Sequence, residues 1–291
     1  MTIAFALEEK ECTMVRRLSC VPLVLVAALA IGASGANAFD DARYPDWGGG
    51  WYRIGSGNWD PDKPRGLGQE APLTPEYQTI LEASIAAQDN GSQGNNAGYR
   101  CIPHGMPRLM LANEPIQFVI VPETTYVMLE LFNQGRHIYT DGRGWPQRFT
   151  PASLGYSIGR WLDSKSDGRF DTLVVETRGL KGPRAYDNTG LPFHKDGGSI
   201  IRERIWLDEA KPDVLHNEIT TIDHALTRPW TVTRSYRRER NPKWTEDICT
   251  DYNAHVVIHD EDYLLSWDGL LMPTRKDQPP PDLRHFDQPQ P

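Results

Sequence analysis

Ser199-Ile-Ile-Arg-Glu-Arg-Ile-Trp-Leu207 is the stretch of sequence that decides the fold. Alternate residues of a β-strand point to the same face of a sheet, so this run has two distinct faces. One face carries Ile201, Glu203, Ile205 and Leu207, and the other carries Ile200, Arg202, Arg204 and Trp206. Glu203 therefore interrupts an otherwise apolar face, which identifies it as a polar residue directed toward a core.

Similar runs of β-branched and aromatic residues follow one another after Cys101, separated by turn dipeptides such as Asp141-Gly142 and Asp167-Gly168. The predicted strands are 116–122, 125–132, 136–140, 155–162, 170–178, 199–207, 214–223 and 230–238. This pattern is typical of an all-β domain. We expect an antiparallel, lipocalin-like barrel, or a strongly curved sheet, of about eight or more strands.

The segment before these strands has a different character. Residues 39–72 are rich in Gly, Pro, Trp and Asp, centred on Trp47-Gly-Gly-Gly-Trp51, and are expected to form an irregular arm. Thr74, Pro75 and Glu76 then predict a helix start, with a capping hydroxyl, a proline in the first turn and an acid near the positive end of the helix dipole. The helix is expected to end at 89–91.

The N-terminus has the three parts of a secretory signal peptide. Arg16 and Arg17 form a basic region, residues 21–31 are apolar, and Ala36-Asn37-Ala38 is a small-residue cleavage site. The apolar stretch is shorter than the roughly 20 residues that span a bilayer, so we expect no membrane span. Cleavage near Ala38 would export the protein to the periplasm or the medium, and Met14 is an alternative start to Met1.

The remaining chain is expected to form a single barrel-like domain, 39–275, followed by a proline-rich tail, 276–291. Its net charge is -8, and it has no long basic run. A domain of this kind lacks the positive surface that phosphate backbones require, so nucleic acid is not an expected partner. The oligomeric state is left open.

Only Cys101 and Cys249 lie outside the predicted signal peptide. Disulfides form and persist in the oxidising compartments to which such a signal directs a protein. We therefore predict a bridge between these two cysteines. The alternative is a pair of buried free thiols.

Charged residues on the strands are the candidate site residues. Glu176 lies in a strand with apolar residues on both faces, so it is either partly buried with a raised pKa or paired with an arginine. Buried polar groups on neighbouring strands cost stability unless they satisfy one another. Glu176 and Glu203 thus indicate either a ligand pocket or a structural polar network.

An ordered set of motifs covers nearly all of the chain after residue 38. It comprises Cys101-Ile-Pro-His-Gly-Met-Pro-Arg108, Glu130-x5-Arg136-x-Ile138, Asp141-Gly-Arg143, Gly155-Tyr-Ser-Ile-Gly-Arg-Trp161, Asp171-Thr-Leu-Val-Val-Glu-Thr177, Glu203-Arg204, Thr220-x2-Asp223, Pro229-Trp230 and Cys249. This set resembles a family of secreted bacterial proteins, most of which have no assigned function. The resemblance implies neither a reaction nor catalytic residues. Trp145-Pro146 stands where members have His-Pro, and residues 163–169 are an insertion.

The sequence predicts no metal site and no cofactor. The closest histidine spacing is His255-x3-His259, in a strand-like segment that would separate the two side chains by about 13 Å. Gly155-Tyr-Ser-Ile-Gly159 matches the serine-hydrolase motif literally, but it continues into a strand where that motif requires a turn into a helix. Nucleotide-binding motifs are absent from the sequence.

Two functions remain open, and both place a hydrophobic, aromatic small molecule in the barrel. In a cofactor-independent lyase, a decarboxylase or isomerase, Glu176 or Glu203 would be the general acid or base and His194 would shuttle protons. The expected substrate-binding residues are His104, Arg108, Arg136, Asp141, Arg143, Trp145 and Trp161. In the alternative, a periplasmic carrier, the charged residues form only a polar network and loop-anchoring salt bridges.

Overall fold

The computed structural model describes residues 41–96, 98, 101–182, 184–249, 254–259, 261–266 and 270–282. The predicted signal peptide, 1–38, and residues 283–291 of the predicted tail lie outside these ranges. No helix within the described residues is long and apolar enough to cross a membrane.

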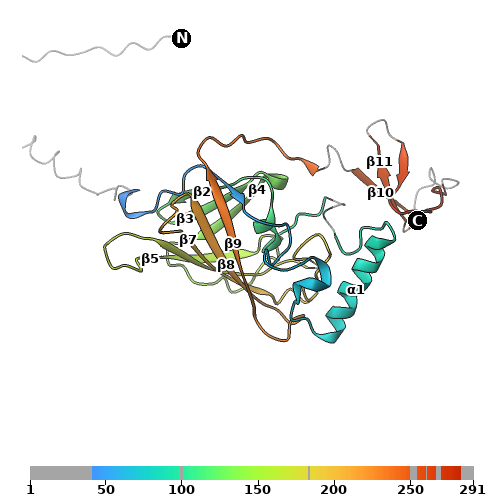
Figure 1. Ribbon diagram of the computed structural model, residues 1–291, viewed down its shortest axis with the longest axis horizontal. Coiled ribbons are helices and arrows are strands. Elements are labelled where there is room, and N and C mark those ends of the chain that lie inside the picture. The colour runs from blue at the N-terminus through green and yellow to red at the C-terminus, as the bar shows by residue number, and fades with distance from the viewer. Residues whose placement is uncertain are drawn as a thin grey trace, which may run out of the picture. The chain divides into compact units, whose positions relative to one another are not determined.

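Nine strands form a closed barrel (Figure 1). They are β1 (Gly50–Arg53), β2 (Ile116–Val121), β3 (Thr124–Leu129), β4 (Gln134–Tyr139), β5 (Tyr156–Leu162), β6 (Thr172–Arg178), β7 (Ile200–Leu207), β8 (Val214–Ile222) and β9 (Trp230–Glu239). Each strand pairs with its neighbours in the sequence, and β1 pairs with both β2 and β9. The predicted all-β, lipocalin-like barrel is confirmed.

One pair departs from the expected antiparallel arrangement. β4 and β5 run parallel, with Ile138 opposite Ser157 and Tyr139 opposite Ile158, whereas the other neighbouring pairs of the barrel are antiparallel. Parallel strands require a crossover connection, which a tight hairpin cannot supply. Residues 140–155 provide that connection, so Asp141-Gly142 lies within a crossover between parallel strands and not in a tight hairpin.

The predicted irregular arm is in part a structural element of the barrel. β1 lies within it and closes the sheet, because Trp51 pairs with Ile116 of β2 and with Arg238 of β9. Trp47, Trp51 and Trp59 are fully buried. The arm was predicted as irregular because this short, glycine-rich strand has no usable alternation.

The helix α1 (Pro75–Asp89) begins and ends where the sequence predicts. Tyr77 and Leu81 are buried. Thr74 occupies the N-cap position, but its side chain makes no capping hydrogen bond, so the predicted capping hydroxyl is wrong. Short 3-10 helices complete the connections: η1 (Asp41–Arg43), η2 (Gly66–Gln69), η4 (Arg108–Leu111) and η5 (Leu131–Asn133).

A second, three-stranded antiparallel sheet follows the barrel in sequence. It consists of β10 (Ala254–Ile258), β11 (Glu261–Leu265) and β12 (Leu271–Pro273). The segment around His255 and His259 was identified as strand-like from the sequence, in agreement with β10, whereas β11 and β12 were not predicted. The chain before β10 is tied to the barrel loops by a disulfide between Cys101 and Cys249, with Cα atoms 5.5 Å apart, as predicted.

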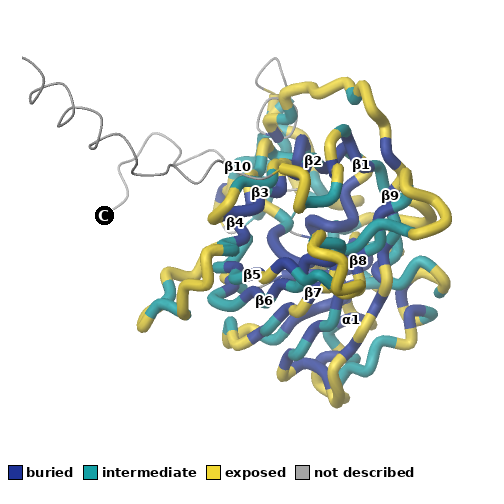
Figure 2. Tube along the Cα trace, turned by 90° about the vertical axis from the view of Figure 1, so that its left-hand side faces the viewer, coloured by how far each residue is buried: buried dark blue, intermediate teal, exposed yellow. Residues whose placement is uncertain are grey.

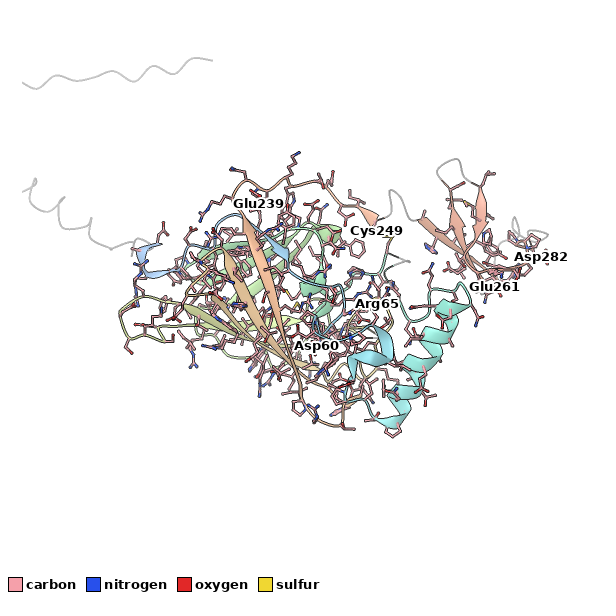
Figure 3. All side chains as sticks on the ribbon, viewed as in Figure 1. Asp60, Arg65, Glu239, Cys249, Glu261 and Asp282 are labelled. Carbon is pink, nitrogen blue, oxygen red and sulfur yellow. A yellow bond between two sulfur atoms is a disulfide. The ribbon has the colours of Figure 1, made fainter. Side chains whose placement is uncertain are left out.

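Burial alternates along the barrel strands as the sequence predicts (Figure 2). Ile201, Glu203 and Ile205 of β7 are buried, whereas Arg202 and Arg204 are exposed. The buried apolar side chains of the arm and of the barrel strands belong to one hydrophobic cluster; Figure 3 draws the described side chains on the ribbon. The interior is therefore a packed core that also contains buried polar residues, among them Glu203.

Candidate functional site

Five polar residues meet inside the barrel, one from each of β4 to β8. Arg136 donates from Nε to Ser157 Oγ at 3.1 Å, from Nη2 to Thr177 Oγ1 at 2.8 Å, and from Nη1 to Glu203 Oε1 at 3.1 Å. Its Nη2 also donates to the second carboxylate oxygen of Glu203. Asn217 Nδ2 donates to Glu203 Oε1 at 2.9 Å, which completes this interior polar cluster.

The interior polar cluster is closed to solvent. Arg136 is 1% exposed and Glu203 is 3% exposed. Both carboxylate oxygens and all three guanidinium nitrogens already have partners, which is the condition under which a buried ion pair is tolerated. In this arrangement Glu203 and Arg136 have no free group with which to bind or protonate a substrate.

The outer face of the same strands is open. A shallow groove of about 440 Å³ lies across β5 to β8. The side chains that line this outer groove alternate with the buried ones and are Ile158, Arg160, Val174, Glu176, Arg202, Arg204, Glu218 and Thr220. The strand register arranges them in two rows. One row runs Ile158, Glu176, Arg202, Thr220, and the next runs Arg160, Val174, Arg204, Glu218.

Glu176 is an ion-paired carboxylate at the centre of the outer groove. Its Oε2 accepts a hydrogen bond from Arg202 Nε at 2.8 Å, and its Oε1 accepts one from Arg178 Nε at 2.7 Å. Burial raises the pKa of Glu176, but the hydrogen bonds from Arg202 and Arg178 outweigh it, so the net shift is downward. The arginine-paired alternative of the sequence analysis is the one that the structure contains.

An aromatic–arginine cluster adjoins the groove. It consists of Tyr139, Arg143, Trp145, Phe149, Tyr156 and Arg178. The guanidinium of Arg143 lies 3.8 Å from the Tyr139 ring centroid, and that of Arg178 lies 4.5 Å from the Trp145 centroid. Tyr156, Ile158 and Arg160 alternate along β5, so the cluster and the groove share one strand face.

Asp141 fixes the position of Arg143. Its carboxylate accepts hydrogen bonds from Arg143 Nε and Nη2, the latter at 2.6 Å, and from the Arg143 backbone N–H at 3.1 Å. These side-chain and backbone hydrogen bonds lower the pKa of Asp141 to about 2. Both residues were predicted to bind substrate, and the structure places them with Trp145 beside the outer groove.

Two predicted site residues lie elsewhere. Trp161 points into the core, where its ring centroid is 4.8 Å from that of Trp47 and its Nε1 donates to Thr125 Oγ1 at 3.2 Å. Arg108 is buried in η4, and its Nη2 donates to Asn188 Oδ1 at 2.5 Å. Neither lines the outer groove.

His104 lies near the disulfide, beside Phe132, with ring centroids 5.2 Å apart. Burial, reinforced by the charge of Arg108, lowers the pKa of His104 to about 3. The imidazole is therefore neutral at physiological pH. A neutral ring in this position supports packing of the loop that follows Cys101.

The three predicted catalytic residues are not brought together. Glu176 and Glu203 lie on neighbouring strands but on opposite faces of the barrel wall. His194 lies in the loop before β7, where its Nδ1 is 3.0 Å from Asp196 Oδ1. The strand patterns assigned Glu176 and Glu203 to neighbouring strands, but the separation of the two side chains by the barrel wall is seen only in the structure.

The groove residues Arg160, Arg204 and Glu218 were not among the predicted site residues. The signal that could have identified them is the alternation itself, because Arg202 and Arg204 were already placed on the face opposite Glu203.

No protein-family model matches this chain, and no curated protein matches it. The family resemblance drawn from the motifs stays a prediction.

Proposed function

We propose that this protein is an exported, periplasmic or secreted, binding protein for a small hydrophobic acid, preferably an aromatic one. The outer groove is the binding site, in place of the barrel interior that the sequence analysis favoured. The observation that carries the proposal is the combination, on one open face, of an apolar floor with exposed arginines and an adjoining aromatic cluster. Such sites orient an apolar ligand through a few polar contacts.

Arg160 and Arg204 are the groups proposed to hold the carboxylate. Both pair with Val174, one from each side, so the two arginines flank a small apolar residue in the same row. Neighbouring strands are about 4.8 Å apart, which puts the two backbones roughly 10 Å from each other and lets both guanidinium groups reach one anion. Both side chains are exposed.

The apolar body of the ligand would lie along β5. Ile158 is two residues from Arg160, and Tyr156 is two residues further, so all three side chains share the outer face. Tyr156 then leads to Trp145, with ring centroids 6.2 Å apart. An aromatic ring placed over Ile158 would have its carboxylate at the arginines and its far edge at the aromatic cluster.

Two features support binding over turnover. Glu176 is held in its ionised form by two arginines, which makes it a poor general acid. Glu203 has no unpaired oxygen. A cofactor-independent lyase acting on the same class of acid is the competing proposal, and it requires the interior polar cluster to open.

The binding site is tested by titrating the purified protein with a panel of aromatic carboxylic acids and following tryptophan fluorescence and heat of binding. Arg204→Ala is expected to weaken binding about tenfold, because a charge-assisted contact of this kind contributes on the order of 1.5 kcal/mol. Arg237→Ala removes an exposed arginine of β9 outside the groove and serves as the matched control. Equal affinity of Arg204→Ala and the unmodified protein would refute the site.

Turnover is tested on the same ligands by liquid chromatography coupled to mass spectrometry, because an isomerisation leaves the mass of the acid unchanged. A binding protein returns each acid unchanged after incubation. Loss of carbon dioxide or isomerisation, abolished by Glu203→Gln, would instead establish the lyase. Because Glu203→Gln also disturbs the core, its thermal unfolding has to be measured beside its activity.

A further inference from the structure

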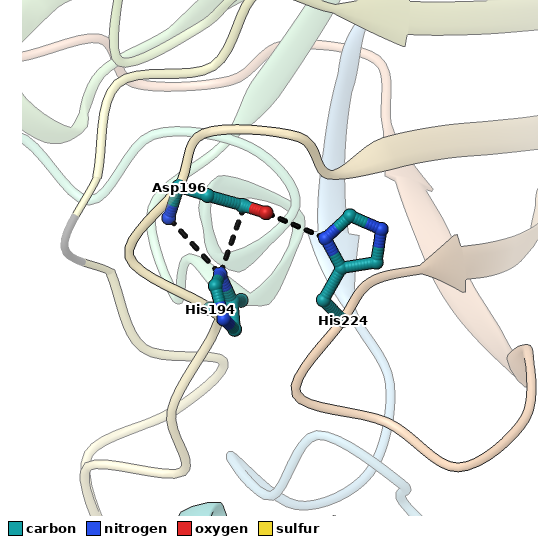
Figure 4. A group of neighbouring side chains, drawn as sticks. All are labelled: His194, Asp196 and His224. Carbon is teal, nitrogen blue, oxygen red and sulfur yellow. Dashed lines mark hydrogen bonds and ion pairs between the residues drawn. The ribbon is translucent and has the colours of Figure 1, made fainter.

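Two loops bring together two histidines and one aspartate, and none of these three residues lines the outer groove. His194 and Asp196 lie in the loop before β7, and His224 follows β8 (Figure 4). Their imidazole nitrogens and carboxylate oxygens all lie within 4.8 Å of one another. We call this group the His–Asp–His cluster.

The donor atoms are spaced as in a metal site. His194 Nδ1 is 3.0 Å from Asp196 Oδ1, and His224 Nδ1 is 2.5 Å from Asp196 Oδ2. In a tetrahedral zinc site with bonds of about 2.0–2.1 Å, neighbouring ligand atoms are about 3.3 Å apart. Small rotations of the side chains would therefore bring one atom of each residue to bonding distance from a single ion.

The hydrogen bonding of His194 indicates that an unprotonated nitrogen faces this space. Its Nδ1 accepts a hydrogen bond from the Asp196 backbone N–H at 3.1 Å, and an Nδ1 that accepts such a bond carries no proton. The same nitrogen is 3.0 Å from Asp196 Oδ1. Because Nδ1 has a single lone pair, an ion bound there would replace the Asp196 N–H as its partner, with Oδ1 as a neighbouring ligand.

The surrounding residues hold the cluster in place. Asp223, which is buried, accepts hydrogen bonds from the backbone N–H groups of His194 and Ala225, both at 2.8 Å, and so connects the two loops. The Asp196 carboxylate is oriented by the Gly198 N–H at 2.8 Å. Supporting hydrogen bonds of this kind are characteristic of metal sites, because they fix the ligands before the ion arrives.

Aromatic packing constrains one of the imidazoles. The His194 ring lies with its centroid 5.2 Å from that of Tyr77 in α1. The hydroxyl of Tyr77 accepts a hydrogen bond from the Lys195 backbone N–H at 3.3 Å. His224, by contrast, is 74% exposed at its side chain, so it is free to adjust to an ion and leaves room for water.

We propose that His194, Asp196 and His224 bind one divalent transition-metal ion of the zinc class. Two imidazole nitrogens and one carboxylate oxygen are the ligands that such ions prefer, and three protein ligands leave a position for solvent or an added ligand. The site is separate from the proposed binding groove and does not depend on it. The prediction of no metal was based on spacing along the sequence, in which His194 and His224 are far apart.

The test uses the chain purified without a polyhistidine tag, freed of metal by a chelator, and titrated with Zn²⁺ by calorimetry. One Zn²⁺ per chain is expected at this site. His224→Gln is expected to weaken that binding by about tenfold or more. His224 is exposed, so this substitution leaves the fold intact, which unfolding measurements verify.

His216→Gln is the matched control. His216 also pairs with an aspartate, with Nε2 3.0 Å from Asp208 Oδ2, but no third metal ligand joins that pair among the described residues. Zn²⁺ affinity is expected to be the same in this variant as in the unmodified chain.

Co²⁺ provides a second readout, since its visible absorption reports nitrogen and oxygen coordination and should disappear in Asp196→Asn. Zn²⁺ affinity and Co²⁺ absorption unchanged in His224→Gln and Asp196→Asn would overturn the proposal.

Discussion

The inner and outer faces of the barrel wall each hold a glutamate paired with arginine, and the two pairs differ in what surrounds them. Glu203 and Arg136 are buried and have every polar atom engaged. Glu176 lies one strand away, on the other face, between Arg178 and Arg202 in an open groove. The same residue types thus serve the core in one place and face solvent in the other.

This difference distinguishes charged side chains that belong to the folded core from charged side chains that can bind a ligand. A buried ion pair is tolerated only with complete hydrogen bonding, which leaves nothing for a ligand. Exposed charges contribute little to stability and can exchange water for a ligand at small cost. The comparison therefore predicts that substitutions inside the barrel change stability, whereas substitutions outside change binding.

The largest expected effect comes from breaking the interior pair. Arg136→Met leaves the carboxylate of Glu203 buried without its partner, which costs about 3–5 kcal/mol of unfolding free energy. Urea unfolding followed by tryptophan fluorescence measures this loss. A loss below 1 kcal/mol would show that water reaches the interior polar cluster and that the two faces are less different than the structure indicates.

Removing both charges sharpens the comparison. The double variant Arg136→Met with Glu203→Leu leaves neither charge unpaired and is expected to recover most of the stability lost in Arg136→Met, because buried ion pairs are often replaceable by apolar residues. The same unfolding measurement applies. A double variant as unstable as Arg136→Met would mean that Ser157, Thr177 and Asn217 require the charged pair for their own hydrogen bonds.

The pH dependence of the unfolding free energy tests a second buried group, the imidazole of His104. Its folded pKa, about 3, is below the ordinary value of 6.5, so protons bind preferentially to the unfolded state. The stability that this neutral ring contributes is complete above pH 6.5 and is lost as the pH falls from 6.5 toward 3. Between pH 7 and pH 5 the loss is at most about 2 kcal/mol. Unfolding curves at these two pH values should diverge less in His104→Gln, and an unchanged difference would contradict the assignment.

The smallest expected effect is on the outer face. Arg202→Ala removes an exposed partner of Glu176 and is expected to change the unfolding free energy by at most about 1 kcal/mol at neutral pH. The folded pKa of Glu176 is lowered, so its contribution is present above the ordinary pKa of a glutamate and is lost as the pH falls through the folded value. The acid limb of the stability profile should therefore flatten slightly in Arg202→Ala. A loss as large as that of Arg136→Met would remove the distinction between the faces.

The strands of the barrel could be predicted because their alternation is local. Each predicted segment from 116 to 238 coincides with one of β2 to β9 within a few residues. β1 escaped prediction because a four-residue strand containing glycine shows no alternation, and its pairing with β2 and β9 depends on partners far away in the chain. The parallel pairing of β4 and β5 escaped for the same reason, since it depends on the path of the connection.

The candidate sites could be predicted only residue by residue. Asp141, Arg143, Trp145 and Glu176 were identified from the sequence and do lie at or beside the outer groove. Arg136 and Glu203 were identified as well, but their burial and their pairing with each other were not. The His–Asp–His cluster was not foreseen, because two loops that are distant in sequence meet only when β7 and β8 pair.

The sequence by itself determined the period of strands β2 to β9, the inward face of Glu203, the helix at α1 and the candidate pair of cysteines for the disulfide. These properties follow from local periodicity and from the small number of possible partners. Closure of the barrel, the separation of a sealed interior from an open outer groove, and the convergence of His194 with His224 were decided by the tertiary structure. Each of them depends on strand pairing, which places distant residues together and fixes which side of the wall water can reach.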